Sequence, residues 1–338
     1  MTVRLDEERI HAVLEERQPK RIVFNSPDGL LRMTREFARR LEKEYDGLQA
    51  ITIADPTYGS CDTVDVDAQR LGADIAFHVG HNVAIQKFGK VTYAIDTYDD
   101  VSFDEVVIKA GTHFKNLGYT TIGLATFAQH IHVLGNASDK LRAAGLNVVI
   151  GKGMGQLRDG QIFGCEFYAG YNIREQVDVM VLLGQSMFHA LGLCLSTGKP
   201  TFMLDPYSNE LIDVQKTADE RLKRAILSIY KARDAERFGI IIGLKEGQIM
   251  VDQSVKLKEK LESFGKSVQL IALREITSDR IDALTDIQAF IQTGCPRISV
   301  DGYTFSKPVL SVPQTDALIN LLSGKQVNAD LFVRKHWL

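Results

Sequence analysis

Short apolar runs alternate with longer segments in which apolar residues recur every three or four positions, over almost the whole chain. Apolar runs of about four to eight residues are typical of buried strands, and the longer periodic segments are typical of amphipathic helices. A regular alternation of such strands and helices favours an α/β protein with mostly parallel sheets.

The same order of elements occurs three times along the chain. Each copy contains a strand, a helix, a second strand and a third strand that ends in glycine followed by a polar or thiol side chain. The first strands are residues 21–25, 120–125 and 238–243, and the third strands are residues 73–81, 177–186 and 287–295. A repeat of about 100 residues is far longer than a solenoid unit, so each copy is expected to be a small α/β domain with its own core.

We therefore expect three similar small domains, arranged with pseudo-threefold symmetry around a central site. Their predicted bounds are residues 1–108, 109–206 and 207–338. The third begins with residues 214–236, in which Leu222, Ile226 and Ile229 recur at helical spacing, and this segment is expected to be a connecting helix.

The composition excludes several classes of protein. The chain of 338 residues has 40 basic and 43 acidic side chains, a net charge of −3, so direct nucleic-acid binding is not expected. The first residues are too charged for a secretory signal, and no run approaches the ~18 apolar residues of a membrane span. Four cysteines without other signs of an oxidising compartment are expected to be reduced thiols of a cytoplasmic protein.

Three of the four cysteines follow predicted strands, one in each repeat. Cys61, Cys165 and Cys295 each have a glycine one or two residues earlier. Loops beyond the carboxyl ends of parallel strands form the working edge of such sheets, so the three thiolates are expected to meet. Cys194 lies in the apolar helical stretch 190–195, where a buried structural thiol is expected.

The three cysteine positions are not strictly equivalent. Cys61 and Cys165 follow the second strand of their repeats, whereas Cys295 follows the third strand directly. His81 and Ser186 occupy the position of Cys295 in the other two repeats. The expected site is therefore approached from two kinds of loop.

Three soft thiolates suit either an iron–sulfur cluster or zinc. A cubane cluster with three cysteine ligands has one iron that can bind a substrate carboxylate and amine. Zinc with three cysteines has one position for water, which would predict hydrolytic chemistry. The long spacings match no short metal-binding motif, so the residue pattern alone leaves both alternatives open.

The sequences around the three cysteines closely resemble those of the archaeal enzymes for the first step of diphthamide biosynthesis, the 2-(3-amino-3-carboxypropyl)histidine synthases. The segments are ADPTYGSCDTVDVDAQRLGADIAFHVGH around Cys61, GQIFGCEFY around Cys165 and IQTGCPRISVDG around Cys295. The resemblance extends in order over nearly the whole chain.

The resemblance implies a homodimer whose protomers each hold a [4Fe-4S] cluster through Cys61, Cys165 and Cys295. It implies S-adenosylmethionine as cosubstrate, although the CxxxCxxC loop of conventional radical enzymes is absent here. Members break the bond between the sulfonium sulfur and the γ-carbon and release methylthioadenosine. The 3-amino-3-carboxypropyl radical passes to a histidine of translation elongation factor 2, and an external electron donor is needed. Catalytic residues beyond the cluster ligands are not assigned.

Four polar residues at predicted strand ends are candidate contacts to S-adenosylmethionine: Tyr58, His81, Gln185 and Ser186. The alternative for each is a helix cap or a turn.

Further polar residues favour structural roles. His78 is expected to be a hydrogen-bonded core or interface histidine, and His130 and His132 are expected to cap a helix or lie at the surface. Asp28 is either a normal turn residue or part of a carboxylate site at a helix start. Residues 151–155 (GKGMG) lack the phosphate-loop pattern and are expected to be a flexible approach to Cys165.

Two other functions stay open at this stage. One is an iron–sulfur dehydratase or condensing enzyme that resembles quinolinate synthase, which also has three related domains around one cluster. The other is a noncatalytic scaffold or ligand-binding module in which all four cysteines are only packed.

Overall fold

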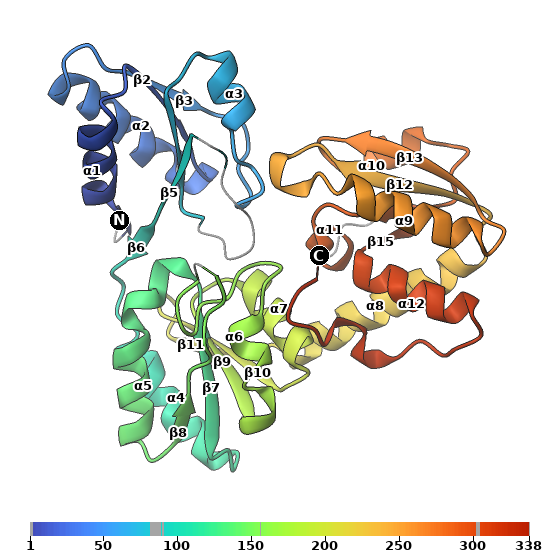
Figure 1. Cartoon of the computed structure of the whole chain (residues 1–338). Helices are drawn as coiled ribbons and strands as arrows, with labels where there is room; N and C mark the ends of the chain where they lie inside the picture. Colours follow the sequence, from blue (N-terminus) through green and yellow to red (C-terminus); the bar gives the residue numbers. More distant parts are fainter. Residues whose placement is uncertain (1–2, 82–88, 90, 156, 302–304, 338) are drawn as a thin grey trace.

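The computed structural model describes residues 3–81, 89, 91–155, 157–301 and 305–337. The first unit (blue to cyan in Figure 1) contains a parallel sheet with strand order β3-β2-β4-β5. Its elements are α1 (Glu7–Arg17), β2 (Arg21–Asn25), α2 (Asp28–Glu44), β3 (Gln49–Ile53), α3 (Asp65–Arg70), β4 (Ile75–Val79) and β5 (Thr92–Ile95). A small antiparallel pair, β1 (Val3–Leu5) with β6 (Thr97–Asp99), joins the two ends of the unit.

The second unit repeats this order as β8-β7-β9-β10, and an antiparallel strand, β11, is added at the β10 edge. Its elements are α4 (Asp104–Asn116), β7 (Thr121–Thr126), α5 (Leu134–Ala143), β8 (Asn147–Val149), α6 (Tyr168–Tyr171), β9 (Val179–Leu183), α7 (Met187–Thr197), β10 (Thr201–Asp205) and β11 (Glu210–Asp213). The predicted border at residue 108 falls inside α4, and β11 lies beyond the predicted border at residue 206. Both elements pack on the second sheet because their apolar residues complete its core.

The third unit has the order β13-β12-β14-β15, again parallel throughout. Its elements are α8 (Gln215–Arg233), β12 (Arg237–Gly243), α9 (Val251–Glu262), β13 (Ser267–Leu273), α10 (Ser278–Ala283), β14 (Ala289–Gln292), α11 (Pro296–Val300), β15 (Val309–Leu310) and α12 (Val312–Leu322). The expected connecting helix is α8, which runs from the second unit to the third (Figure 1). The predicted α/β class with mostly parallel sheets is confirmed.

One hydrogen-bond arrangement recurs in all three units and shows how closely the repeats agree. The side chain just before the third strand accepts bonds from two backbone N–H groups at the start of the first strand, with N···O distances between 2.8 and 3.0 Å. The acceptors are Asp74 for Lys20 and Arg21, Asp178 for Thr120 and Thr121, and Gln288 for Glu236 and Arg237. The acceptor aligns the central pair of strands at the edge opposite the cysteine loops.

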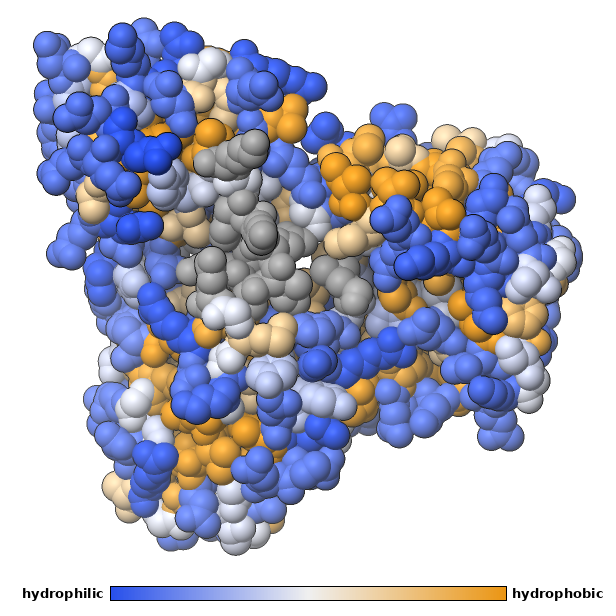
Figure 2. Space-filling view, viewed as in Figure 1, coloured by the Kyte–Doolittle hydropathy of each residue, from blue (hydrophilic) through white to orange (hydrophobic). Residues whose placement is uncertain are grey.

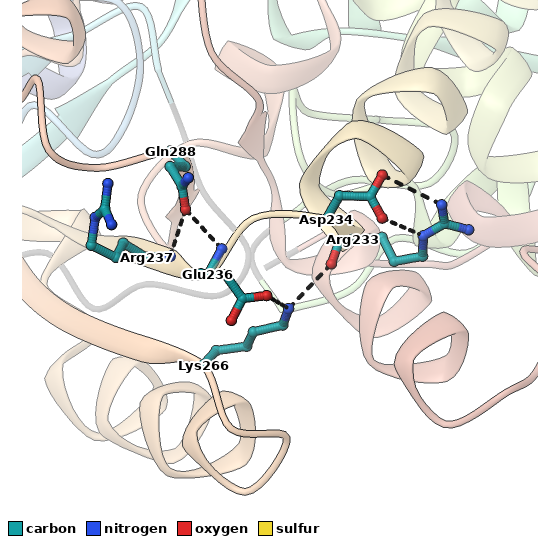
Figure 3. A network of polar contacts seen from close by, with 6 residues as sticks. All are labelled: Arg233, Asp234, Glu236, Arg237, Lys266 and Gln288. Atoms are coloured by element: carbon teal, nitrogen blue, oxygen red, sulfur yellow. Dashed lines mark hydrogen bonds and ion pairs between the residues drawn. The ribbon is translucent and has the colours of Figure 1, made fainter.

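Figure 3 shows this corner in the third unit, where α8 leads into β12. Gln288 bonds the backbone of Glu236 and Arg237, and the Lys266 Nζ pairs with the Glu236 carboxylate at 3.0 Å. The same Nζ donates to the carbonyl of Arg233 at 3.3 Å. The end of the connecting helix α8 is thereby fixed to the beginning of strands β12 and β13.

The core is not divided evenly among the units. The first unit has hydrophobic clusters of its own, whereas a single cluster extends from β9 and α7 of the second unit to α8, β12 and α12 of the third. Residues 190–197 of α7 are all buried, because α7 is apolar around its circumference and needs cover on both sides. Cys194 lies here, 3% exposed, and burial raises its pKa to about 12, so the expected buried thiol is confirmed.

Polar contacts join the first unit to the second. The Gln129 side chain donates to the Gly80 carbonyl at 3.3 Å, Arg158 pairs with Asp96 at 3.0 Å, and the Tyr207 hydroxyl donates to Asp99 at 2.7 Å. On the face drawn in Figure 2, polar side chains are the most frequent, and the larger apolar areas lie over the second and third units. Among the described helices, none combines the length and apolar character that crossing a bilayer requires.

The recurring acceptors give a test of stability against pH. Backbone N–H donation by Thr120 and Thr121 lowers the pKa of Asp178, so its stabilising effect is present above about pH 4 and is lost as the pH falls through the lowered pKa. We expect Asp178→Ala to reduce the free energy of unfolding at pH 7 by about 1 kcal/mol, with a smaller reduction at pH 3.

Gln288→Ala is the matched control, because its amide accepts the same pair of bonds without titrating. Its effect should be equal at both pH values in chemical denaturation. A loss for Asp178→Ala that does not change with pH would contradict this account.

Candidate functional site

Each cysteine of the candidate site lies beyond the carboxyl end of a parallel strand. Cys61 follows β3, Cys165 lies between β8 and α6, and Cys295 is the N-cap residue of α11 in the short loop after β14. No disulfide joins the four cysteines, and these three residues are partly exposed whereas Cys194 is buried. The structure thus has the two kinds of cysteine loop that the sequence predicts.

The three thiols lie within electrostatic range of one another. Burial raises the pKa of the Cys165 thiol well above its usual value, and charge on Cys61 and Cys295 raises it further. Burial also raises the pKa of Cys295 to about 11, to which charge on Cys61 adds. Loops more than one hundred residues apart in sequence therefore bring their sulfur atoms into one electrostatic environment.

This donor set fits a positively charged, sulfur-seeking group. Thiolates are the form of cysteine that binds metals, and three of them so placed repel one another unless cationic charge lies between them. In the described part of the chain, no three His, Cys, Asp or Glu side chains are grouped as ligands of a single metal ion. The donor type alone suits either zinc or an iron–sulfur cluster.

A loop of the third unit holds the Cys61 loop in place. The backbone N–H of Gly247 donates to the Cys61 carbonyl at 3.2 Å, and the Lys245 Nζ pairs with Asp62 at 2.6 Å and with Glu275 at 3.2 Å. The Lys245 side chain is only 11% exposed. Burial opposes its charged form, but Asp62 and Glu275 outweigh burial and raise the pKa of Lys245. This ion pair fixes the first cysteine loop to the third unit.

The segment after α12 runs back toward the second unit and binds the Cys165 loop (Figure 1). The Trp337 N–H donates to the Cys165 carbonyl at 3.2 Å, and the Phe167 N–H donates to the Lys335 carbonyl at 2.8 Å. The Trp337 ring is buried, with its centre 5.0 Å from that of Phe167. The second cysteine loop is therefore also held by the third unit.

A buried carboxyl group lies next to Cys165. Burial raises the pKa of Glu166 to about 7, although the Tyr168 N–H donates to one of its oxygens at 2.7 Å. The other oxygen contacts His336. The sequence analysis did not identify Glu166, because an acidic residue beside a cysteine has no distinctive spacing.

Two imidazoles accompany the cysteines. Burial lowers the pKa of His81 to about 4, with Asp62 opposing the shift, and the His81 ring centre lies 6.4 Å from that of Phe163 in the Cys165 loop. Burial lowers the pKa of His189 to about 3, and Arg297 and His81 lower it further. Both rings are therefore neutral near pH 7. His189 was not predicted, although it follows the N-cap Ser186 by three residues, a spacing typical of capping partners.

The other candidate cofactor contacts have structural partners. The Ser186 hydroxyl caps α7 and hydrogen-bonds with the His189 Nδ1 at 2.8 Å, and the Gln185 Oε1 bonds with the His130 Nε2 at 3.0 Å. Tyr58 is 69% exposed, and its ring lies 4.6 Å from the Lys245 Nζ. The structure places Tyr58 and His81 on the Cys61 side, and Gln185 and Ser186 at the start of α7.

Of the remaining three histidine predictions, two agree with the structure and one does not. His78 is a buried histidine bonded to the Asn25 side chain at 3.1 Å, and His132 is half-buried and pairs with Asp100 at 3.5 Å, as expected. The prediction for His130 was wrong, because it is fully buried between Phe103 and Phe127. Phe127 is close in sequence, but the contact with Phe103 could not be recognised from the residues next to His130.

The two loop candidates are occupied by local contacts. Asp28 is exposed at the first turn of α2. In residues 151–155, Lys152 and the Gly153 N–H both bond to Asp159, at 2.8 and 3.0 Å. A Cβ on Gly151 would lie 1.8 Å from the Ala169 carbonyl oxygen, so glycine there serves close packing of the chain that leads to Cys165.

Residues 26–328 match the model of a family described as "Putative diphthamide synthesis protein". The chain is 29% identical over 306 residues to the 2-(3-amino-3-carboxypropyl)histidine synthase of Pyrococcus horikoshii, covering 89% of this chain and 86% of the relative. It is 27% identical over 328 residues to subunit 1 of the Saccharomyces cerevisiae synthase, covering 94% of this chain and 75% of the relative.

The fold is similar to that of a solved relative. The crystal structure of Dph2 from Pyrococcus horikoshii with a 4Fe-4S cluster aligns with a TM-score of 0.83 and 27% identity, covering 96% of this chain and 93% of that chain. A second crystal structure of the same protein aligns with a TM-score of 0.82 and 28% identity, covering 94% of this chain and 92% of that chain.

The Lys245 contact predicts a local effect on the Cys61 loop. Lys245→Met leaves Asp62 without its cation, so we expect a loss of about 3 kcal/mol in the free energy of unfolding. We also expect faster alkylation of Cys61 in the native metal-free protein, measured by mass spectrometry.

Lys266→Met is the control, because that side chain is 10% exposed and pairs with Glu236 far from the cysteine loops. It should lower stability without changing the alkylation of Cys61. Equal alkylation rates in the parent and Lys245→Met would remove Lys245 from the support of this loop.

Proposed function

The chain belongs to the diphthamide synthesis protein family, and from this membership we propose that it is a 2-(3-amino-3-carboxypropyl)histidine synthase. It transfers the 3-amino-3-carboxypropyl group of S-adenosylmethionine to a histidine of translation elongation factor 2. The observation that carries the proposal is the convergence of Cys61, Cys165 and Cys295, one from each α/β unit.

The three thiolates hold a [4Fe-4S] cluster. When bound and reduced, the cluster supplies the electron with which the bond between the sulfonium sulfur and the γ-carbon is broken, in a radical reaction. The relative with 27% identity whose structure contains a 4Fe-4S cluster supports this assignment. The protein itself positions the substrate and limits access of water.

The polar residues around the cysteines orient S-adenosylmethionine. His81 near Asp62 and His189 near Arg297 are neutral hydrogen-bonding groups, and Tyr58 borders the Cys61 loop. Gln185 and Ser186 act at the start of α7, where Ser186 also orients the His189 ring. Neutral imidazoles suit this place, because they bind polar groups without adding repulsion to the sulfonium cation.

The enzyme acts as a homodimer and receives electrons from an external donor. Both statements follow from the family resemblance, as does the protein substrate. A dimer in size-exclusion chromatography with light scattering supports the first statement, and a monomer at all concentrations opposes it.

Cluster content gives the first test. We expect Cys61→Ala, Cys165→Ala and Cys295→Ala each to lower iron affinity at least about tenfold, because each removes a direct ligand. Cys194→Ala is the matched control and should keep the parent's iron and acid-labile sulfide, since Cys194 is packed in the shared core. The measurement is anaerobic iron and sulfide analysis after reconstitution.

Product analysis gives the second test. With S-adenosylmethionine, dithionite and elongation factor 2 under anaerobic conditions, we expect methylthioadenosine and a modified histidine in equal amounts. A loaded cluster without methylthioadenosine would favour a dehydratase or condensing enzyme of the quinolinate synthase kind. A colourless parent without iron would favour the noncatalytic scaffold.

A further inference from the structure

Arg297 carries a buried charge two residues after Cys295. Its side chain is only 2% exposed, and a guanidinium group keeps its charge even when buried. Its Nε and Nη2 bond the Asp301 carboxylate at 2.7 and 2.6 Å, and Nη2 also donates to the Phe188 carbonyl at 2.5 Å. Asp301 ends α11, the same helix of the third unit that contains Arg297, whereas Phe188 belongs to α7 of the second unit. The charge thus bridges two units.

The guanidinium group lies near two aromatic rings, and both are attached to the Cys165 loop. Its central carbon is 3.9 Å from the centre of the Phe188 ring and 5.4 Å from that of Trp337. A Cβ on Gly164, the residue before Cys165, would lie 2.6 Å from the Phe188 ring, so this ring packs directly on the loop. Trp337 donates its backbone N–H to the Cys165 carbonyl.

The surface of α7 is shaped for this arrangement. A Cβ on Gly192 would lie 2.4 Å from the Arg297 Nη1 and 2.4 Å from the Phe167 ring. Any side chain at Gly192 would displace one of them. Phe167 is itself two residues after Cys165, so α7 presents one small surface to residues beside both cysteines.

We propose that Arg297 is a positioning residue that fixes the separation of the Cys165 and Cys295 thiols and so prepares two of the three cluster ligands. This inference rests on the proposed function, because it concerns the same cluster. Cation–aromatic contacts of a desolvated guanidinium group are stronger than those at a surface, and they define orientation as well as distance.

The test compares the parent with Arg297→Lys, which keeps the charge but loses the planar fork and its stacking. We expect lower iron and sulfide content after reconstitution and an altered electron paramagnetic resonance spectrum of the reduced cluster. In the metal-free protein, we expect alkylation of Cys165 to be about tenfold faster, the change that loss of one desolvated cation–aromatic contact would produce.

Arg174→Lys is the matched control. Arg174 lies 3.8 Å from the centre of the Tyr171 ring, donates to the Tyr171 carbonyl at 2.8 Å and pairs with Glu175 at 3.2 Å, all within its own segment. This variant should match the parent in cluster content, spectrum and Cys165 alkylation. A merely structural role for Arg297 would change its melting temperature without changing the spectrum or the alkylation rate.

Phe188→Leu decides the question if Arg297→Lys does not fold. Phe188 is 39% exposed, so its replacement leaves the core intact while removing the ring between Arg297 and Gly164. Reduced cluster content with faster Cys165 alkylation supports the proposal. Parent-like behaviour in Phe188→Leu, or in a folded Arg297→Lys, overturns it. Absence of iron from the parent would instead contradict the proposed function.

Discussion

Repulsion among three partly desolvated thiolates is the constraint on which this molecule depends. Burial and neighbouring negative charge both raise the pKa values of Cys165 and Cys295, so the thiols resist ionisation until cationic charge compensates them. The surrounding architecture keeps the three loops together despite this cost. Lys245 and Gly247 hold the first loop, and Trp337 holds the second.

The same fold unit serves all three loops, but the loops differ in their attachment. Hydrogen bonds from the first strand to Asp74, Asp178 or Gln288 set the central strand pair of each sheet. The loops at the carboxyl ends of the strands can then differ in length and attachment between units. This division explains how Cys295 comes to follow a third strand while Cys61 and Cys165 follow second strands, without disturbing the sheets.

Most of the fold could be predicted from the sequence, because strand and helix periodicity is a local property. The strand at residues 21–25 and the helix start at Leu134 agree with the structure to the residue. The cysteine loops could also be located, since strand ends and glycines mark them. Arg297 and Trp337 could not, because their importance depends on rings and carbonyl groups supplied by other units. His130 shows the same limit, since its burial depends on Phe103, which belongs to a different part of the sequence, as well as on the nearby Phe127.

The unequal core makes the three units unequally sensitive to dissolved salt. The second and third units share a continuous apolar cluster, so the elements that carry Cys165 and Cys295 are held together by contacts that dissolved ions hardly affect. Ion pairs such as Lys245 with Asp62 and Arg158 with Asp96 attach the first unit to the other two. Counter-ions weaken exposed pairs more than buried ones, so the half-exposed Arg158 is the contact of the first unit that added salt loosens first.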